Sequence, residues 1–285
     1  MSSDNTPDGR EAIGRTECRR AVISPARAAA LAAALDLDSA PGGGASLPPA
    51  WHWMFFNPVA RRSELGPDGH PRRGEFVPEL GLPRRMWAGG RLVYHAPLPV
   101  GAEAIRESEI IDVSTKKGRS GRLGFVTIRH RISHASTLCI EEEQDLVFRE
   151  AAVPGAPGAS PVSAPDDARW SEVFVPDPVL LFHYSALTDN GHRIHYDLSY
   201  TRLVEGYRDL VVHGPLVATL LHGLAARCRG GVPIRRFAFR AMAPLFVDRP
   251  FRLEAVTSED HSGLSLWARG PEGELAMQAT ASFDD

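Results

Sequence analysis

The chain has 285 residues, of which 43% are hydrophobic and 24% are charged, and its formal net charge is −3. This length suits two domains with cores of their own, and the near-neutral charge predicts no nucleic-acid partner. Cys18, Cys139 and Cys228 lie far apart and are odd in number, which excludes a disulfide framework and a structural zinc site and favours the reducing cytoplasm. The first residues are polar, and no apolar run approaches the ~18 residues of a membrane span, so we expect neither a signal peptide nor membrane association.

The first expected element in chain order is a helix. Ser24 is a good N-cap residue, Pro25 suits the first helical position, and the Ala- and Leu-rich stretch that follows predicts a helix up to Leu37. The glycine-rich residues 41–46 end it, and residues 48–76 are aromatic at first and then loop-like. The first half therefore offers no second clear helix before its strands.

Two segments of the chain repeat each other at an offset of 147 residues. The matching residues are Ala96, Pro97, Leu98 and Val100 in the first copy and Ala243, Pro244, Leu245 and Val247 in the second. Each copy is followed by alternating apolar and polar segments separated by turn residues, which is typical of a meander of antiparallel strands. We therefore predict a duplicated unit, with an N-terminal domain at 1–150 and a C-terminal domain at 170–285.

Residues 151–169 separate the two predicted domains. They consist almost wholly of Ala, Pro, Gly, Ser and Asp. Such a composition buries too little apolar surface to order itself, so we predict a linker.

Two helices are expected in the second half. Residues 175–188 predict an extended entry followed by a short helix, and a stronger helix begins after His213-Gly214. Pro215 suits its first position, leucines recur at helical spacing from 216 to 224, and two glycines at 230–231 end it. Strand candidates follow, so the second half predicts an apolar helix wrapped by a curved antiparallel sheet.

Histidines gather where the second half begins: His183, His192, His195, His213 and His222. His222 and His183 lie within predicted helices, where packing or solvent contact explains them. His192 and His195 lie near Asp189 and Asp197, which could suggest a metal site. The His-Glu-x-x-His order of a metalloprotease helix is absent, however, so we expect no metal.

Residues 182–197, FHYSALTDNGHRIHYD, followed by VHGPL at 212–216, resemble the MaoC-like enoyl-CoA hydratases and hydroxyacyl-thioester dehydratases. The resemblance is closest to their two-domain subgroup, which includes mesaconyl-C4-CoA and itaconyl-CoA hydratases. The family signature is an Asp, then Asn-Pro, an aliphatic residue and a His, five positions after the Asp. His195 and Ile194 match it, but Asn190, His192 and Arg193 stand where the family has Asp, Asn and Pro.

The resemblance covers nearly the whole chain, because residues 84–101 are also similar to the degenerate N-terminal half of that subgroup. It implies an α+β fold, the double hotdog, in which each half wraps an antiparallel sheet around a central helix. It also implies that the second half is catalytic and that the first half shapes the space for substrate and CoA. Hotdog sheets have exposed edges and usually pair, so a homodimer is expected.

The residues themselves favour hydration of an alkene conjugated to a thioester. The reaction needs a base for water, a donor for the developing enolate oxygen and an acid for the alpha carbon. His195 is the natural base because imidazole titrates near neutrality. The backbone N–H of Gly214, next to His213 at a helix N-terminus, is the natural oxyanion donor.

Because the family aspartate is absent, two residues are candidates for the polar group that assists His195. Asn190 cannot transfer a proton at ordinary pH, but it can orient water or hold His195 by a hydrogen bond. Asp189 lies one position earlier and supplies a carboxylate if the loop shifts its register.

Arginines and aromatic residues are the candidates for substrate binding. Arg193 is the first candidate for the CoA phosphates, and Arg202, Arg235 and Arg236 are further ones. A dicarboxylic acyl group has a free carboxylate, which an arginine can bind by two parallel hydrogen bonds. Candidates from the first half are Arg84, Arg85 and Arg91, with the aromatic residues Trp87 and Tyr94.

The sequence thus predicts a hydro-lyase that converts itaconyl-CoA or mesaconyl-C4-CoA to citramalyl-CoA, as in itaconate degradation, without a metal or redox cofactor. The alternatives are a hydroxyacyl-thioester dehydratase of fatty-acid type and a non-catalytic protein that binds acyl thioesters. A hotdog thioesterase is excluded because it needs a carboxylate on the central helix, and residues 216–228 contain no Asp or Glu.

Overall fold

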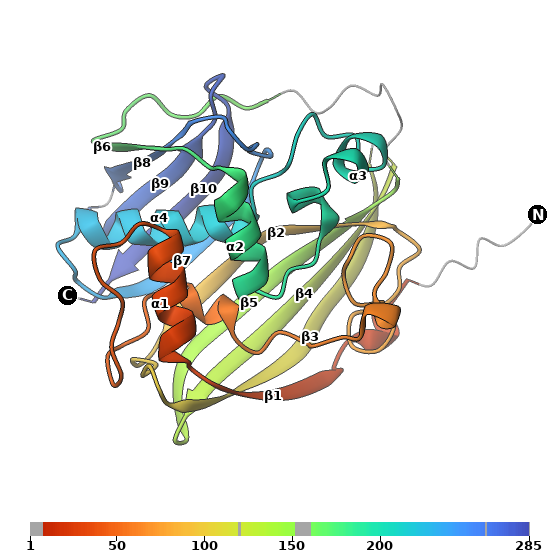
Figure 1. The fold of residues 1–285 in the computed structure, drawn as a ribbon, viewed down its shortest axis with the longest axis horizontal. Helices are drawn as coiled ribbons and strands as arrows, with labels where there is room; N and C mark the ends of the chain where they lie inside the picture. The colour runs from red at the N-terminus through yellow and green to blue at the C-terminus, as the bar shows by residue number, and fades with distance from the viewer. Residues whose placement is uncertain (1–7, 119–120, 152–160, 260, 285) are drawn as a thin grey trace, which may run out of the picture.

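A computed structural model describes residues 8–118, 121–151, 161–259 and 261–284. Its strands form one ten-stranded sheet in the order β1-β3-β4-β5-β2-β7-β10-β9-β8-β6 (Figure 1). Each half contributes five strands in mirrored order, and β2 and β7 pair antiparallel where the halves meet. The two halves therefore share one continuous sheet.

The strands of the first half are β1 (Thr16–Val22), β2 (Arg84–Tyr94), β3 (Glu103–Gly118), β4 (Gly121–His134) and β5 (Thr137–Arg149). Those of the second half are β6 (Trp170–Phe174), β7 (Ile234–Ala241), β8 (Phe251–Thr257), β9 (Gly263–Arg269) and β10 (Leu275–Phe283). The α-helices are α1 (Pro25–Ala34), α2 (Pro178–Leu187), α3 (Leu198–Leu203) and α4 (Gly214–Cys228). Short 3-10 turns are η1 (Arg10–Ala12), η2 (Trp51–Met54), η3 (Arg62–Glu64) and η4 (Arg193–His195).

The predicted repeat is confirmed by matching hydrogen bonds in the two halves. In the first half, the Leu47 N–H donates to the carbonyl of Leu98 over 2.8 Å. In the second, the Val212 N–H donates to the carbonyl of Leu245, the repeat partner of Leu98, over 2.9 Å. Both leucines are buried. The repeated segment therefore forms the same connection after β2 and after β7.

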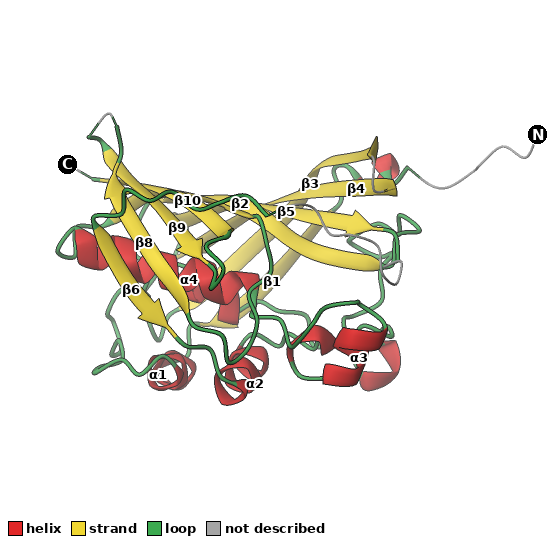
Figure 2. Cartoon of the chain, turned by 90° about the horizontal axis from the view of Figure 1, so that it is seen from above, coloured by secondary structure: helices red, strands yellow, loops and turns green. Residues whose placement is uncertain are grey.

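The halves differ in what covers the sheet. Helix α4 has 15 residues and lies along one face, while α1, α2 and α3 lie on the same side farther from the sheet (Figure 2). Leu216, Leu221 and Leu224 of α4 are buried in the main core against the strands of the second half. Between β1 and β2, where every residue is described, the first half has the ten-residue α1 as its one α-helix, followed by the short turns η2 and η3. The sequence predicts this single helix but not β1, which precedes it.

Helix α1 begins as predicted, with the Ser24 hydroxyl accepting the N–H of Arg27 over 3.3 Å. It ends at Ala34 instead of Leu37, because Asp36 has a φ of 51° and the chain turns back. The predicted helix at 175–188 is α2, and the Asp177 carboxylate caps it by accepting the N–H of Leu180 over 2.8 Å.

The predicted linker is only partly tested, because residues 152–160 lie outside the described residues. Two residues of the described part of the predicted linker are bound to the second half by backbone hydrogen bonds. The Ala164 N–H donates to the carbonyl of Gly273 over 2.9 Å, and the Leu275 N–H donates to the carbonyl of Val162 over 2.7 Å. The backbone of this proline-rich stretch thus pairs with the turn before β10, which its composition does not reveal. The proposed domain bounds stay a prediction.

Within the described ranges, no helix is long and apolar enough to cross a membrane.

Candidate active site

The candidate site is a cleft at the N-terminal end of α4. Its walls include the start of α4, the part of β2 around Trp87, and residues of two loops, 70–73 and 188–195. The polar and aromatic residues that carry the argument are His70, Arg85, Trp87, His192, His195 and Gly214, all of which line the cleft. The cleft therefore joins a loop and a strand of the first half to a loop and a helix of the second.

His195 occupies the end of η4 and is 6% exposed. Its Nδ1 lies 2.7 Å from the carbonyl oxygen of Val211. A carbonyl only accepts, so Nδ1 carries the proton and Nε2 keeps a free lone pair. Burial lowers the pKa of His195 to about 3, so the ring is neutral at pH 7. The geometry gives this histidine the tautomer that a general base needs.

His213 and Gly214 place the start of α4 against His195. His213 is the N-cap residue, and its ring stacks on that of His195 with centroids 3.6 Å apart. Gly214 is the first residue of the helix, where the N–H has no intrahelical acceptor. A Cβ on Gly214 would lie 3.2 Å from Trp87, which is tighter than ordinary contact. The helix therefore presents a free N–H beside the base, under the Trp87 ring.

The loop of the first half is joined closely to the histidine loop of the second. Gly69 has a φ of 90°, and a Cβ on it would lie 2.0 Å from the carbonyl oxygen of Gly191. The Arg193 N–H donates to the carbonyl of Asp68 over 2.9 Å. These contacts bring the His70 ring to 4.7 Å from that of His192. Sequence reasoning missed His70, because nothing in either loop shows that the two meet.

Asn190 shapes the histidine loop. Its Oδ1 accepts the N–H of His192 over 3.0 Å, and its own N–H donates to the carbonyl of Ser185 over 2.9 Å. The family aspartate position is thus filled by a side chain that fixes His192 at a sharp turn. Its amide nitrogen makes no hydrogen bond with the described residues.

Asp189 points away from this group. It has a φ of 49°, and its carboxylate pairs with Arg27 of α1 over 2.7 Å. Its side chain is 39% exposed. The loop does not shift its register, so the structure does not bring this carboxylate to His195.

Arg193 is engaged within its own loop. Its guanidinium lies 2.7 Å from the Asp197 carboxylate and 4.2 Å above the ring of Tyr200, and it donates to the carbonyl of Pro67. It therefore positions the histidine loop, and the structure does not leave it free for CoA phosphates.

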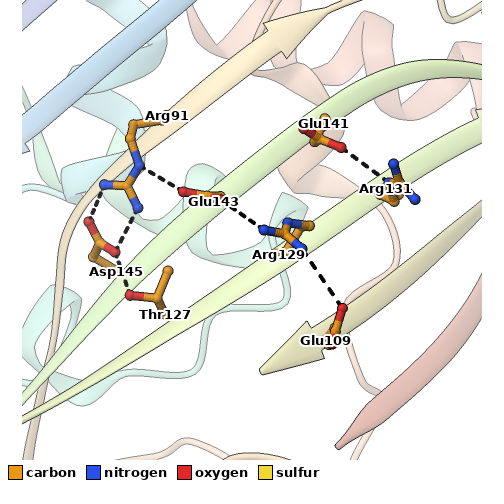
Figure 3. A network of polar contacts seen from close by, with 8 residues as sticks. All are labelled: Arg91, Glu109, Thr127, Arg129, Arg131, Glu141, Glu143 and Asp145. Atoms are coloured by element: carbon orange, nitrogen blue, oxygen red, sulfur yellow. Dashed lines mark hydrogen bonds and ion pairs between the residues drawn. The ribbon is translucent and has the colours of Figure 1, made fainter. Parts of the chain in front are cut away.

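Arg91 and Tyr94 are not brought to His195 either. Arg91 pairs with Asp145 over 2.7 Å and with Glu143 over 3.0 Å (Figure 3). Its neighbour Leu92 is buried in the core on the α4 side, so Arg91 lies on the opposite face of the sheet. The Tyr94 hydroxyl instead contacts His222, over 3.0 Å, well along α4 from Gly214. Of Arg91, Trp87 and Tyr94, Trp87 is the one that lies against Gly214, and the predicted Arg85 lines the cleft as well.

Comparison with known proteins identifies the family of the chain. The family of hydroxyacyl-thioester dehydratase type 2 matches residues 50–247. Mesaconyl-C4-CoA hydratase of Chloroflexus aurantiacus is 51% identical over 274 residues, which is 95% of this chain and 96% of that protein. Hydroxyacyl-thioester dehydratase type 2 of Schizosaccharomyces pombe is 30% identical over 236 residues, 73% of this chain and 77% of that protein.

Solved structures share the fold at low identity. A MaoC-like dehydratase of Phytophthora capsici has a TM-score of 0.71 at 13% identity, covering 98% of both chains. A double hotdog protein of Mycobacterium tuberculosis has a TM-score of 0.60 at 14% identity, covering 95% of this chain and 96% of the other. The chain therefore belongs to the hydroxyacyl-thioester dehydratase type 2 family, and its fold is the double hotdog that the sequence predicts.

Proposed function

We propose that the protein is a CoA-thioester hydratase that adds water to mesaconyl-C4-CoA and forms citramalyl-CoA. The observation that carries the proposal is the neutral His195, whose Nε2 is left unprotonated and whose ring stacks on His213, the residue directly before the N–H at the start of α4. A base and an oxyanion donor next to each other are what hydration of a conjugated thioester requires. The 51% identical relative, named for this reaction, supports the choice of substrate.

The reaction proceeds by two proton transfers through one base. Nε2 of His195 takes a proton from water while the water oxygen bonds to the beta carbon. The electron pair of the double bond moves to the thioester, whose oxygen accepts the N–H of Gly214 and is stabilised by the helix dipole. The protonated His195 then gives its proton to the alpha carbon, which restores the base. All these groups belong to the chain, so the proposal requires no metal or redox cofactor.

The choice between the two acyl groups rests on whether the double bond is conjugated with the thioester. In mesaconyl-C4-CoA the double bond is conjugated with the thioester, so the oxygen held by Gly214 receives the electrons. In itaconyl-CoA the double bond is not conjugated with the thioester, and the same donor stabilises its reaction less. We therefore propose itaconyl-CoA as the slower substrate of the two.

The alternative function is dehydration of a hydroxyacyl thioester of fatty-acid type, which the yeast relative favours by its name. A non-catalytic acyl-thioester binder is the other alternative, and the asparagine at the family aspartate position favours it. The two alternatives differ from the proposed function, and from each other, in which esters the protein should turn over.

The test is to mix the purified protein with mesaconyl-C4-CoA, itaconyl-CoA, crotonyl-CoA and a long-chain enoyl-CoA and to follow the loss of the conjugated-thioester absorbance, with product analysis for itaconyl-CoA. Fastest conversion of mesaconyl-C4-CoA is the expected result. Preference for the long-chain ester would establish the fatty-acid alternative, and binding without turnover would establish the binder.

A further inference from the structure

Arg85 lies on the same face of β2 as Trp87, two residues away. Opposite them on β5, Arg85 pairs with Phe148 and Trp87 with Leu146, and both β5 side chains are buried in the core. Residues two apart on a strand point to the same face. Arg85 therefore points into the cleft, next to the Trp87 ring that covers Gly214.

The Arg85 guanidinium has no partner in the part of the chain that the structure describes. It makes no hydrogen bond there, and no carboxylate lies within ion-pair distance. Its neighbours are paired: Arg84 binds Glu205 over 2.7 Å, and Arg73 contacts Glu79 over 3.6 Å. Among these arginines, Arg85 alone keeps its charge available.

The surroundings of Arg85 do not neutralise it. Burial lowers the pKa of Arg85 to about 10, against the attraction of Asp68, so it remains a cation at neutral pH. Burial and the charge of Arg85 keep the pKa of His70 well below its ordinary value, and burial lowers that of His192 to about 4. Both rings are neutral. Asp68 attracts this cation without forming an ion pair with it, and a partly buried cation that lacks a direct partner favours an anionic ligand beside it.

We propose that Arg85 binds the free carboxylate of the acyl group and so selects dicarboxylic CoA esters; the identity of the reacting ester rests on the proposed function. With the thioester oxygen at Gly214, below Trp87, a carboxylate at Arg85 lies about 6.6 Å farther along β2. The acyl chain then lies in the cleft that His195 also lines. A guanidinium binds a carboxylate by two parallel hydrogen bonds, which fixes the orientation of the acyl chain as well as its charge.

The test uses unreactive esters, so that it does not depend on turnover. Binding of succinyl-CoA, butyryl-CoA and CoA is measured by calorimetry for the wild type, Arg85→Gln and the matched control Arg91→Gln. The wild type and Arg91→Gln should bind succinyl-CoA roughly 100-fold more tightly than butyryl-CoA. Arg85→Gln should bind both esters alike, with its affinity for butyryl-CoA and CoA retained.

Two results would overturn the proposal. One is a preference for succinyl-CoA that survives in Arg85→Gln. The other is an equal loss of all three ligands, which would place a CoA phosphate at Arg85 instead. Arg85→Lys keeps the charge but not the paired hydrogen bonds, and should retain only about a tenth of the preference. It also provides the test if Arg85→Gln does not fold. Loss of hydration on every ester with an intact Arg85-dependent preference would refute only the proposed function.

Discussion

Two buried regions of the molecule are rich in histidine, and they use it differently. The cleft region holds His70, His192, His195 and His213 at the N-terminus of α4. The first-half cluster, named for four of its five residues, holds His52, Trp53, Tyr94 and Glu142 together with His222 of α4. The two regions contain similar side chains, and they differ in how the nitrogen atoms of His195 and His222 are used.

The first-half cluster is organised around a buried carboxylate. Glu142 is 2% exposed and lies 3.0 Å from His52 Nε2 and 3.0 Å from Trp53 Nε1. Burial alone would raise the pKa of Glu142, but these hydrogen bonds and nearby histidines lower it to about 2. His222 binds the carbonyl of Ala218 through Nδ1 and the hydroxyl of Tyr94 through Nε2. Both nitrogens of His222 are therefore used.

In the cleft, by contrast, the Nε2 atom of His195 has no partner among the described residues, and Arg85 is an unpaired cation. Burial lowers the pKa of both His195 and His222 to about 3. Burial is thus shared, and the free nitrogen atom is the difference. His195 thus differs from His222 in having an unused nitrogen at the cleft, and the proposed role of His195 as base rests on this difference rather than on the pKa alone.

The largest effect on stability is expected in the first-half cluster. Glu142→Gln removes the charge and replaces one of the two carboxylate oxygens, which contact His52 and Trp53 separately, by an NH2 group that cannot accept. The free energy of unfolding should therefore fall by about 2–3 kcal/mol. Urea denaturation measures it. Glu143→Gln, on the opposite face of the same strand, should change it by less than ~1 kcal/mol. Hydration by the folded Glu142→Gln protein should be retained, and a selective loss of turnover would move this cluster into the active site.

The pH dependence of stability should be common to both regions. The pKa of His195 and of His222 is lowered on folding, so the unfolded chain binds more protons below pH ~6.5 and acid destabilises the fold. When the pH falls from 7 to 5, the free energy of unfolding should decrease in all three proteins. The decrease should be about 1–2 kcal/mol smaller in His195→Asn and in His222→Asn than in the wild type. Denaturation curves at the two pH values measure this, and identical losses in all three proteins would show that these histidines are not buried neutral.

Gly214→Ala should lower kcat/KM about tenfold, because its Cβ would push against Trp87 and displace the N–H. Gly223→Ala is the control in the same helix. Its Cβ meets only the flexible end of Arg227, so activity should not change. Equal rates for both variants would argue against the helix start as the oxyanion site.

Asp189→Ala should have the smallest effect. The variant breaks a half-exposed pair with Arg27, so stability should change by less than ~1 kcal/mol and turnover by less than about twofold. Arg27→Gln should behave alike. A large loss of kcat in Asp189→Ala alone would restore this carboxylate as an acid.

The sequence predicted the fold, and it singled out His195 and the start of α4, which the structure brings together, because these depend on local patterns. Their catalytic roles stay a prediction. The repeat at Leu98 and Leu245, the caps of the helices and the histidine spacing are all short-range signals. It failed for Arg91, Arg193 and Asp189, whose partners come from folding and use up their charges. It missed His70 for the same reason: the close contact of Gly69 with Gly191 joins residues that are far apart in the chain.

The most direct test compares one histidine from each half of the molecule. His195→Asn keeps a donor for the Val211 carbonyl but removes the base, whereas His130→Asn alters a buried ring that binds Ser108 and Gln144. The measurement is kcat/KM for mesaconyl-C4-CoA. The account predicts a loss of about 1000-fold for His195→Asn and near wild-type activity for folded His130→Asn. Comparable activity in the two variants would contradict it.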